Sequence, residues 1–347
     1  MSNQRKIAKL MGVTQATVSL ALRDSREVSA ELRTKIKQKA SQLGYRQNDY
    51  MNNLMKRVRS GRKLTSIGTI ALLVDWPSEM DWYRTSECFR LYHPAVKQRA
   101  LELGFKVETF YLKAPGMDSA KIDRILYSRG IQGILLVMQY GEEGAAKLDM
   151  KWDRYVCLIT GMGFLKQDFD RVCADHVQNM IYAVEALKAR GYERIGLIME
   201  PGFAVERSRG AKYGIGYVGY QMSLPASARI PIYDERLGDR SPILFLKWYR
   251  RWQPEVILTM AIHDDEKWLR EVGLRVPEDV ALACVDRPSG SHFAGIEELH
   301  SEMGKISVEQ LIAKIGRSEF GEPAHPIQIL TDGHWVDGET VPNLVKP

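Results

Sequence analysis

From Ser66 onward, short apolar runs alternate with amphipathic stretches of helical periodicity, and this alternation constrains the fold more than any other feature. We expect strands at 67–74, 106–111, 133–137, 155–159, 194–199, 256–259 and 280–285. Helices are expected between them, for example at 93–103, 119–128, 179–189, 243–251 and 266–271. Strands that alternate with helices form parallel sheets covered by helices on both faces. The βα units repeat loosely and predict two similar lobes, not a short-period solenoid.

The length and composition exclude several other classes of protein. A chain of 347 residues is long enough for about two domains, and no apolar run approaches the roughly 18 residues of a membrane span. The polar N-terminus has no hydrophobic signal region, so we expect a cytoplasmic protein that does not contact a membrane. Four cysteines lie far apart without a CxxC pair and are interpreted as buried, reduced thiols. We therefore expect no metal site and no cofactor.

Charge is distributed unevenly along the chain. Residues 1–63 hold 15 lysines and arginines against four acidic residues, a net charge of +11, whereas the remainder has a net charge of −5. A basic N-terminal segment on a mildly acidic body suggests a nucleic-acid-binding region. A solvated helical face rich in lysine would give the same composition, so motifs have to decide between the two.

Residues 5–23, RKIAKLMGVTQATVSLALR, follow the plan of a helix-turn-helix. Gly12 breaks the first helix, Thr14 is a suitable N-cap for the second, and Ser29 is a suitable cap for a third. In this motif the N-terminal residues of the second helix meet base edges in the major groove. Glutamine can bond adenine and alanine can contact a thymine methyl group. The predicted DNA contacts in this motif are Thr14, Gln15, Ala16, Thr17, Ser19 and Arg23. Taken alone, the pattern would also fit an ordinary helical hairpin.

Residues 7–48, IAKLMGVTQATVSLALRDSREVSAELRTKIKQKASQLGYRQN, resemble the LacI/GalR family of bacterial transcription regulators. The helix-turn-helix, the third helix and the "LGY" segment appear in the family's order and spacing. Further along, RGIQGILLV (129–137), GYERIGLI (191–198) and VPEDVAL (276–282) resemble family segments. The resemblance implies a fold with an N-terminal all-α helix-turn-helix head and a periplasmic-binding-protein-like α/β core of two doubly wound parallel-sheet lobes. It also implies a homodimer that binds operator DNA and takes a small effector, a sugar or sugar derivative, between the lobes.

The chain departs from the family pattern at several positions. Leu20 stands where the family often has an arginine that contacts guanine, so we expect Arg23 to reach a base or a phosphate. Gln47-Asn48 replaces the family's Pro-Asn, although Asn48 can still cap a hinge helix. Leu54 matches the family's minor-groove wedge, and a contact between two hinge helices is the alternative for it. Met51 replaces a small alanine, which makes close packing of two such helices harder.

The effector site is expected at the carboxyl ends of strands, where open α/β sheets bind ligands. The loop at 75–93 is rich in aromatic and charged residues that suit a sugar, and its candidates are Asp75, Trp76, Trp82, Tyr83, Arg84 and Tyr92. The resemblance adds Arg207, His263 and Asp286 as effector-binding positions. A structural salt bridge at the lobe interface is the alternative for Arg207 and Asp286.

The sequence predicts a regulator and not an enzyme, because it lacks the GxxxxGK[ST], HExxH and GxSxG motifs. GIGYVG at 214–219 lies in a helical stretch and does not follow a strand. The alternative is a helix-turn-helix head fused to a sugar-processing enzyme core. The expected domains are a head at 1–46, a hinge or linker at 47–63 and a core at 64–347. Within the core, lobe one is expected at about 64–163 and 296–322, and lobe two at about 164–295 and 323–347.

Overall fold

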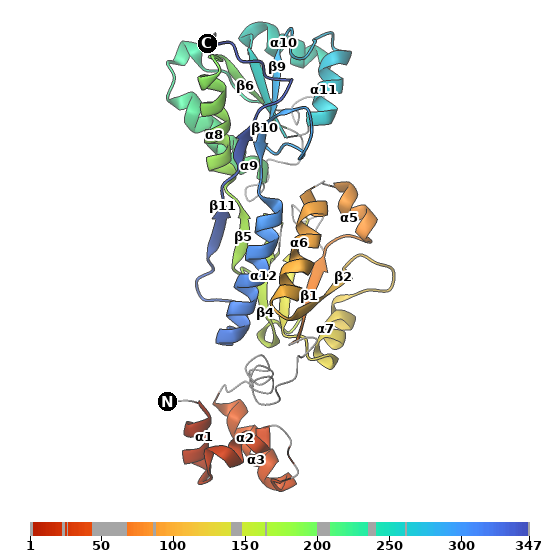
Figure 1. Cartoon of the computed structure of the whole chain (residues 1–347), viewed down its shortest axis with the longest axis vertical. Coiled ribbons are helices and arrows are strands. Elements are labelled where there is room, and N and C mark those ends of the chain that lie inside the picture. The colour runs from red at the N-terminus through yellow and green to blue at the C-terminus, as the bar shows by residue number, and fades with distance from the viewer. Residues whose placement is uncertain are drawn as a thin grey trace. The chain divides into compact units, whose positions relative to one another are not determined.

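The computed structural model describes residues 3–22, 25, 27–43, 68–85, 88–139, 148–163, 165–199, 209–234, 241–260 and 262–345. The chain divides into two compact units, one made of residues 1–67 and 314–319 and the other of residues 68–313 and 320–347 (Figure 1). The expected hinge at 47–63 lies outside the described residues. No helix in the described part of the chain is long and apolar enough to cross a membrane.

The head is a small bundle of helices around one apolar cluster. Its helices are α1 (Asn3–Met11), α2 (Gln15–Leu22) and α3 (Ala30–Gln42). Gly12 has a φ of +65°, which suits glycine and ends α1. Thr14 Oγ1 accepts the backbone N–H of Thr17 at 3.1 Å, and Ser29 Oγ accepts that of Leu32 at 3.3 Å, so both predicted N-caps are confirmed.

The head's core follows the expected helical periodicity with one exception. Its buried residues are Ile7, Ala8, Val18, Ala21, Val28, Ile36 and Ala40. Leu10 of α1 is this exception, because it is apolar but 54% exposed, whereas Ile7 and Ala8 of the same helix are buried in the cluster.

The core contains two sheets of six strands each within the described residues. The first sheet has the order β11-β5-β4-β3-β1-β2 and the second the order β12-β10-β9-β8-β6-β7. The strands of the first sheet are β1 (Gly68–Val74), β2 (Phe105–Tyr111), β3 (Gly133–Val137), β4 (Val156–Thr160), β5 (Arg171–Ala174) and β11 (Gln328–Thr331). Those of the second are β6 (Ile195–Met199), β7 (Tyr233–Asp234), β8 (Val256–Thr259), β9 (Ala281–Cys284), β10 (Ala294–Glu297) and β12 (His334–Val336). All strand pairs are parallel except β10 with β12, so the predicted class of fold is confirmed.

Helices flank both sheets (Figure 1). They are α5 (Glu79–Thr85), α6 (Cys88–Glu102), α7 (Ser119–Ser128), α8 (His176–Ala189), α9 (Arg209–Met222), α10 (Pro242–Trp252), α11 (Ile262–Glu271) and α12 (His300–Arg317). Strands β3, β4 and β6 are buried along their whole length, as their continuous apolar runs require when helices cover both faces. GIGYVG lies inside α9, as expected.

The chain crosses between the sheets in a way that the predicted lobe boundaries did not capture. We placed residues from 164 onward in lobe two, but β5 belongs to the first sheet, and β11 likewise lies there and not in lobe two. The chain crosses from the lobe of one sheet to the lobe of the other at three places, which we call the crossing segments. They lie between β5 and α8, between β10 and α12, and between β11 and β12. The sequence analysis missed β5, β10, β11 and β12 because these strands are short and no long apolar run marks them. Strand β11 is also partly exposed.

Candidate functional site

The outer surface of α2 begins with three exposed residues, Thr14, Gln15 and Ala16. Thr17 and Ser19 are half-buried, and Val18 and Ala21 are buried in the head. Arg5 Nε donates to Gln15 Oε1 at 3.2 Å, which places a cation beside the glutamine. The first turn of α2 therefore presents an amide, a methyl group and hydroxyls to the exterior, the groups that distinguish base edges in a major groove.

Three further predicted DNA contacts cannot be placed on this surface. Arg23, Asn48 and Leu54 all lie outside the described residues. Their part in DNA binding stays a prediction.

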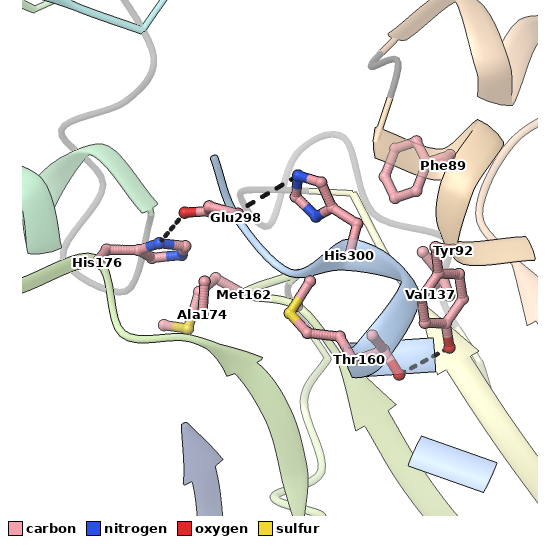
Figure 2. Close-up of a pocket in the computed structure, with 11 residues that line it drawn as sticks. Phe89, Tyr92, Val137, Thr160, Met162, Ala174, His176, Glu298 and His300 are labelled. Atoms are coloured by element: carbon pink, nitrogen blue, oxygen red, sulfur yellow. Dashed lines mark hydrogen bonds and ion pairs between the residues drawn. The ribbon is translucent and has the colours of Figure 1, made fainter. Parts of the chain in front are cut away.

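The core holds a cavity at the carboxyl ends of β3, β4 and β5 (Figure 2). It encloses about 450 Å³ of space free of protein atoms, part of which is open to solvent. The described residues that line it are Phe89, Tyr92, Val137, Thr160, Gly161, Met162, Ala174, His176, Glu298, His300 and Met303. The lining includes residues of two crossing segments, since His176 begins α8 and Glu298 lies between β10 and α12.

One side of the cavity is largely apolar, and hydrogen bonds between hydroxyl groups hold its side chains in place. Tyr92 from α6 donates its hydroxyl proton to Thr160 Oγ1 at 2.9 Å, and Thr160 Oγ1 lies 3.0 Å from Ser307 Oγ of α12. Burial raises the pKa of Tyr92 to about 12, so its hydroxyl stays protonated. Phe89 adds an aromatic face, and Trp76 packs behind it with ring centroids 5.4 Å apart.

The opposite side is built around the carboxylate of Glu298, which is 4% exposed. Its Oε1 accepts hydrogen bonds from Tyr213 Oη at 2.5 Å, His176 Nδ1 at 3.0 Å and Asn179 Nδ2 at 3.2 Å. Burial, and secondly the Asp286 carboxylate, oppose ionisation of Glu298. The hydrogen bond and charge of His176, together with the charge of His300, outweigh them and hold the pKa of Glu298 below its ordinary value.

This carboxylate also joins all three crossing segments. Asn179 of α8 uses its amide N–H on Glu298, while its Oδ1 accepts the backbone N–H of Gly333 at 2.7 Å. Gly333 lies between β11 and β12, and Glu298 lies between β10 and α12. Asp175 places α8 for these contacts, because its side chain accepts the N–H of Gln178 at 2.9 Å as an N-cap. A ligand at Glu298 would thus touch the hydrogen-bond network that ties these segments together.

The structure brings together some of the predicted effector residues but not others. Tyr92 lines the cavity, and Asp286 Oδ1 lies 3.1 Å from His300 Nε2 at its wall. The side chain of Arg84 in α5, that of His263 in α11 and the whole of Arg207 are outside the described parts.

Asp75, Trp76 and Tyr83 are not among the described lining residues. Asp75 is fully buried, 3.3 Å from Lys113 Nζ, and Tyr83 bonds Glu79 and His93. The aromatic loop largely packs against itself, so direct contact of these three residues with a ligand stays a prediction.

The sequence analysis missed the polar residues of the cavity, namely Thr160, His176, Glu298 and His300. No short motif contains them, because His176 and Glu298 are 122 positions apart. The usable signal was position in the chain: Thr160 directly follows the strand predicted at 155–159, and His176 follows a helix-capping aspartate.

Comparisons with known proteins agree with this architecture. The family model described as "Bacterial regulatory proteins, lacI family" matches residues 5–48. The HTH-type transcriptional regulator CelR of Thermobifida fusca is 25% identical over 356 residues, covering 96% of each chain. The lactose operon repressor of Escherichia coli strain K12 is 22% identical over 342 residues, covering 93% of this chain and 88% of the repressor.

Solved structures show the same fold. A transcriptional regulator CelR–cellobiose complex aligns with a TM-score of 0.58 at 18% identity, covering 98% of this chain and all of the other. The lac repressor dimer bound to operator and the anti-inducer ONPF aligns with a TM-score of 0.56 at 18% identity, covering 97% and 98% of the two chains. These relatives are transcriptional regulators rather than enzymes. Residues 5–48, which hold the helix-turn-helix, match the lacI family of bacterial regulatory proteins, and the core of two lobes has the fold of the solved regulators CelR and lac repressor.

Proposed function

We propose that this protein is a transcriptional repressor that binds operator DNA as a homodimer and whose operator affinity is set by a small, sugar-like effector. The observation that carries the proposal is the pairing of two features in one chain. The first turn of α2 exposes base-reading groups, and the core holds a cavity lined by residues of two crossing segments. The CelR–cellobiose complex shows that a relative of this fold takes a disaccharide.

The cavity chemistry supports a polyhydroxylated ligand. Carboxylate and imidazole groups on one side can bond hydroxyls, and the rings of Phe89 and Tyr92 can pack on an apolar sugar face. A ligand that favours one arrangement of the crossing segments changes the core's conformational equilibrium by its differential affinity for the two states. By linkage, an effector that lowers operator affinity must bind the DNA complex more weakly by the same factor.

The reading surface is tested by changing Gln15 and Ala16. Gln15→Ala and Ala16→Gln are each expected to change the preferred half-site by roughly 1–3 kcal/mol per altered base contact. The measurement is selection of bound sequences from random operators, followed by gel shifts on the selected sites. Gln38→Ala, at an exposed glutamine of α3, is the matched control and should return the wild-type site. If the Gln15 and Ala16 variants also returned the wild-type site, α2 would not be the reading element.

The effector site is tested at Asp286. Saccharides that include cellobiose and lactose are first screened for an increase in the protein's melting temperature. Asp286→Asn is then expected to weaken the stabilising sugar by roughly 5- to 150-fold, since an unpaired buried partner costs about 1–3 kcal/mol. Calorimetry measures this, and a gel shift without sugar should be unchanged.

Asp153→Asn, at an exposed aspartate that does not line the cavity, is the control and should bind sugar normally. Full sugar affinity in Asp286→Asn would contradict a role for Asp286 in the effector site.

A further inference from the structure

Three potential metal ligands meet at the wall of the cavity. One side-chain donor atom each from Asp286, Glu298 and His300 lie within 4.8 Å of one another. His300 Nε2 is 3.1 Å from Asp286 Oδ1 and 3.9 Å from Glu298 Oε2. Asp286 follows β9, whereas Glu298 lies between β10 and α12 and His300 begins α12, so the fold and not a sequence motif brings them together.

The separations suit coordination of one ion. Carboxylate oxygens and imidazole nitrogens bind zinc at about 2.0–2.2 Å, which in tetrahedral geometry places neighbouring ligand atoms roughly 3.3–3.6 Å apart. The 3.1 Å separation lies slightly below that range and the 3.9 Å separation slightly above it, so shifts of His300 and Asp286 by a few tenths of an ångström would bring both into it.

Glu298 is held as a preorganised ligand would be. Its Oε1 takes the three hydrogen bonds from Tyr213, His176 and Asn179, which fix the plane of the carboxylate. Its Oε2 accepts no hydrogen bond from the described residues, although the residue as a whole is 4% exposed and lines the cavity. Metal-binding carboxylates are oriented in this way, by partners on the oxygen that does not bind the ion.

The donor set indicates which ion would bind. One imidazole nitrogen with two carboxylate oxygens suits zinc and its first-row neighbours, whereas magnesium and calcium prefer oxygen ligands alone. Two neighbouring carboxylates, one of them fully buried, also favour a compensating cation. Glu298 and His300 border the cavity, so the remaining coordination positions would face the space available to a small molecule.

We propose that Asp286, Glu298 and His300 bind a divalent first-row transition-metal ion, Zn²⁺ or Co²⁺, at the wall of the cavity. The alternative is a protonated His300 that pairs with the two carboxylates and excludes a metal ion.

The test uses the full-length protein, freed of metal by dialysis against a chelator and titrated with Co²⁺ and with Zn²⁺ in the absence of DNA and sugar. We expect one ion per chain, measured by elemental analysis and calorimetry. The Co²⁺ form should show visible bands of nitrogen and oxygen ligands without sulfur charge transfer, because the described cysteines Cys157, Cys173 and Cys284 are buried elsewhere in the sheets. Asp286→Asn, Glu298→Gln and His300→Gln should each weaken the ion by roughly 100-fold or more, beyond the 10–100-fold typical of residues that only support a ligand.

Two further variants make the result specific. His292→Gln is the matched control, because His292 Nε2 faces the Glu266 carboxylate at 3.9 Å as a second imidazole–carboxylate pair, and it should leave binding unchanged. Tyr213→Phe removes one support of Glu298 and should weaken the ion by about 10-fold. If Glu298→Gln does not fold, judged by circular dichroism, the Asp286 and His300 variants decide.

The proposal is overturned if neither ion binds, or if binding survives the Asp286 and His300 changes. It is equally overturned if the His292 control loses the ion. Because no DNA or sugar enters the titration, its failure would leave the proposed regulatory function untouched.

Discussion

Removal of residues 1–60 is expected to abolish specific operator binding while the core stays folded. The deleted segment holds the described helices of the head and has a net charge of +9, against +6 for the whole chain. Specific binding by DNA-reading proteins typically exceeds their non-specific binding by roughly 10³-fold or more, and that whole margin should disappear. Gel shifts at fixed salt measure the loss, since phosphate contacts make affinity depend on ionic strength.

The core is expected to fold without the head, because it has hydrophobic clusters of its own. Its two sheets each carry apolar clusters that include no residue from α1, α2 or α3. The truncated chain should therefore keep cooperative thermal unfolding and its far-ultraviolet circular dichroism. Specific operator binding by residues 61–347 would contradict the assignment of α2 as the reading helix.

Asn179→Leu is expected to lower the stability of the core substantially. Asn179 is fully buried, donates to Glu298 and accepts from the backbone N–H of Gly333. Leucine has nearly the same size but leaves both partners without the amide. At about 1–3 kcal/mol for each of the two lost hydrogen bonds, the unfolding free energy should fall by roughly 2–6 kcal/mol. The melting temperature should drop by roughly 4–24 °C, at about 2–4 °C per kcal/mol.

Glu185→Leu is the matched control on the same helix, because Glu185 is exposed. It should change the unfolding free energy by no more than about 0.5 kcal/mol, as is usual for surface positions. Urea titration measures the unfolding free energy of both variants and of the wild-type protein. Equal stabilities would show that the contacts of Asn179 between the crossing segments contribute nothing measurable.

Local structure was largely predictable because it depends on nearby residues. The apolar runs predicted β1, β2, β3, β4, β6, β8 and β9 to within one or two residues. Thr14 and Ser29 cap helices as expected, because an N-cap needs only a side-chain oxygen two or three residues before the N–H that it accepts. The exposed turn of Thr14, Gln15 and Ala16 followed from the same helical periodicity.

The cavity was predictable in its place but not in its residues. The carboxyl ends of parallel strands were the expected location, and the cavity lies there. Yet the aromatic loop that we expected to contact a sugar buries Trp76 and Trp82 in its own packing. An aromatic side chain fits a hydrophobic core and a sugar face equally well, so its type alone cannot distinguish the two.

By itself, the sequence determined the helix-turn-helix, the alternation of strands and helices that builds the two sheets, and the resemblance to a family of regulators, because these rest on local spacing. Only the tertiary structure decided that β5 and β11 join the first sheet, and that Asp286, Glu298 and His300 meet at one wall. The same holds for Asn179, which joins segments more than 100 residues apart through Glu298 and Gly333. Such contacts form where the chain crosses between the sheets. A single hydrogen bond between distant residues produces no periodic pattern in the sequence, because it depends on two residues and not on those next to them.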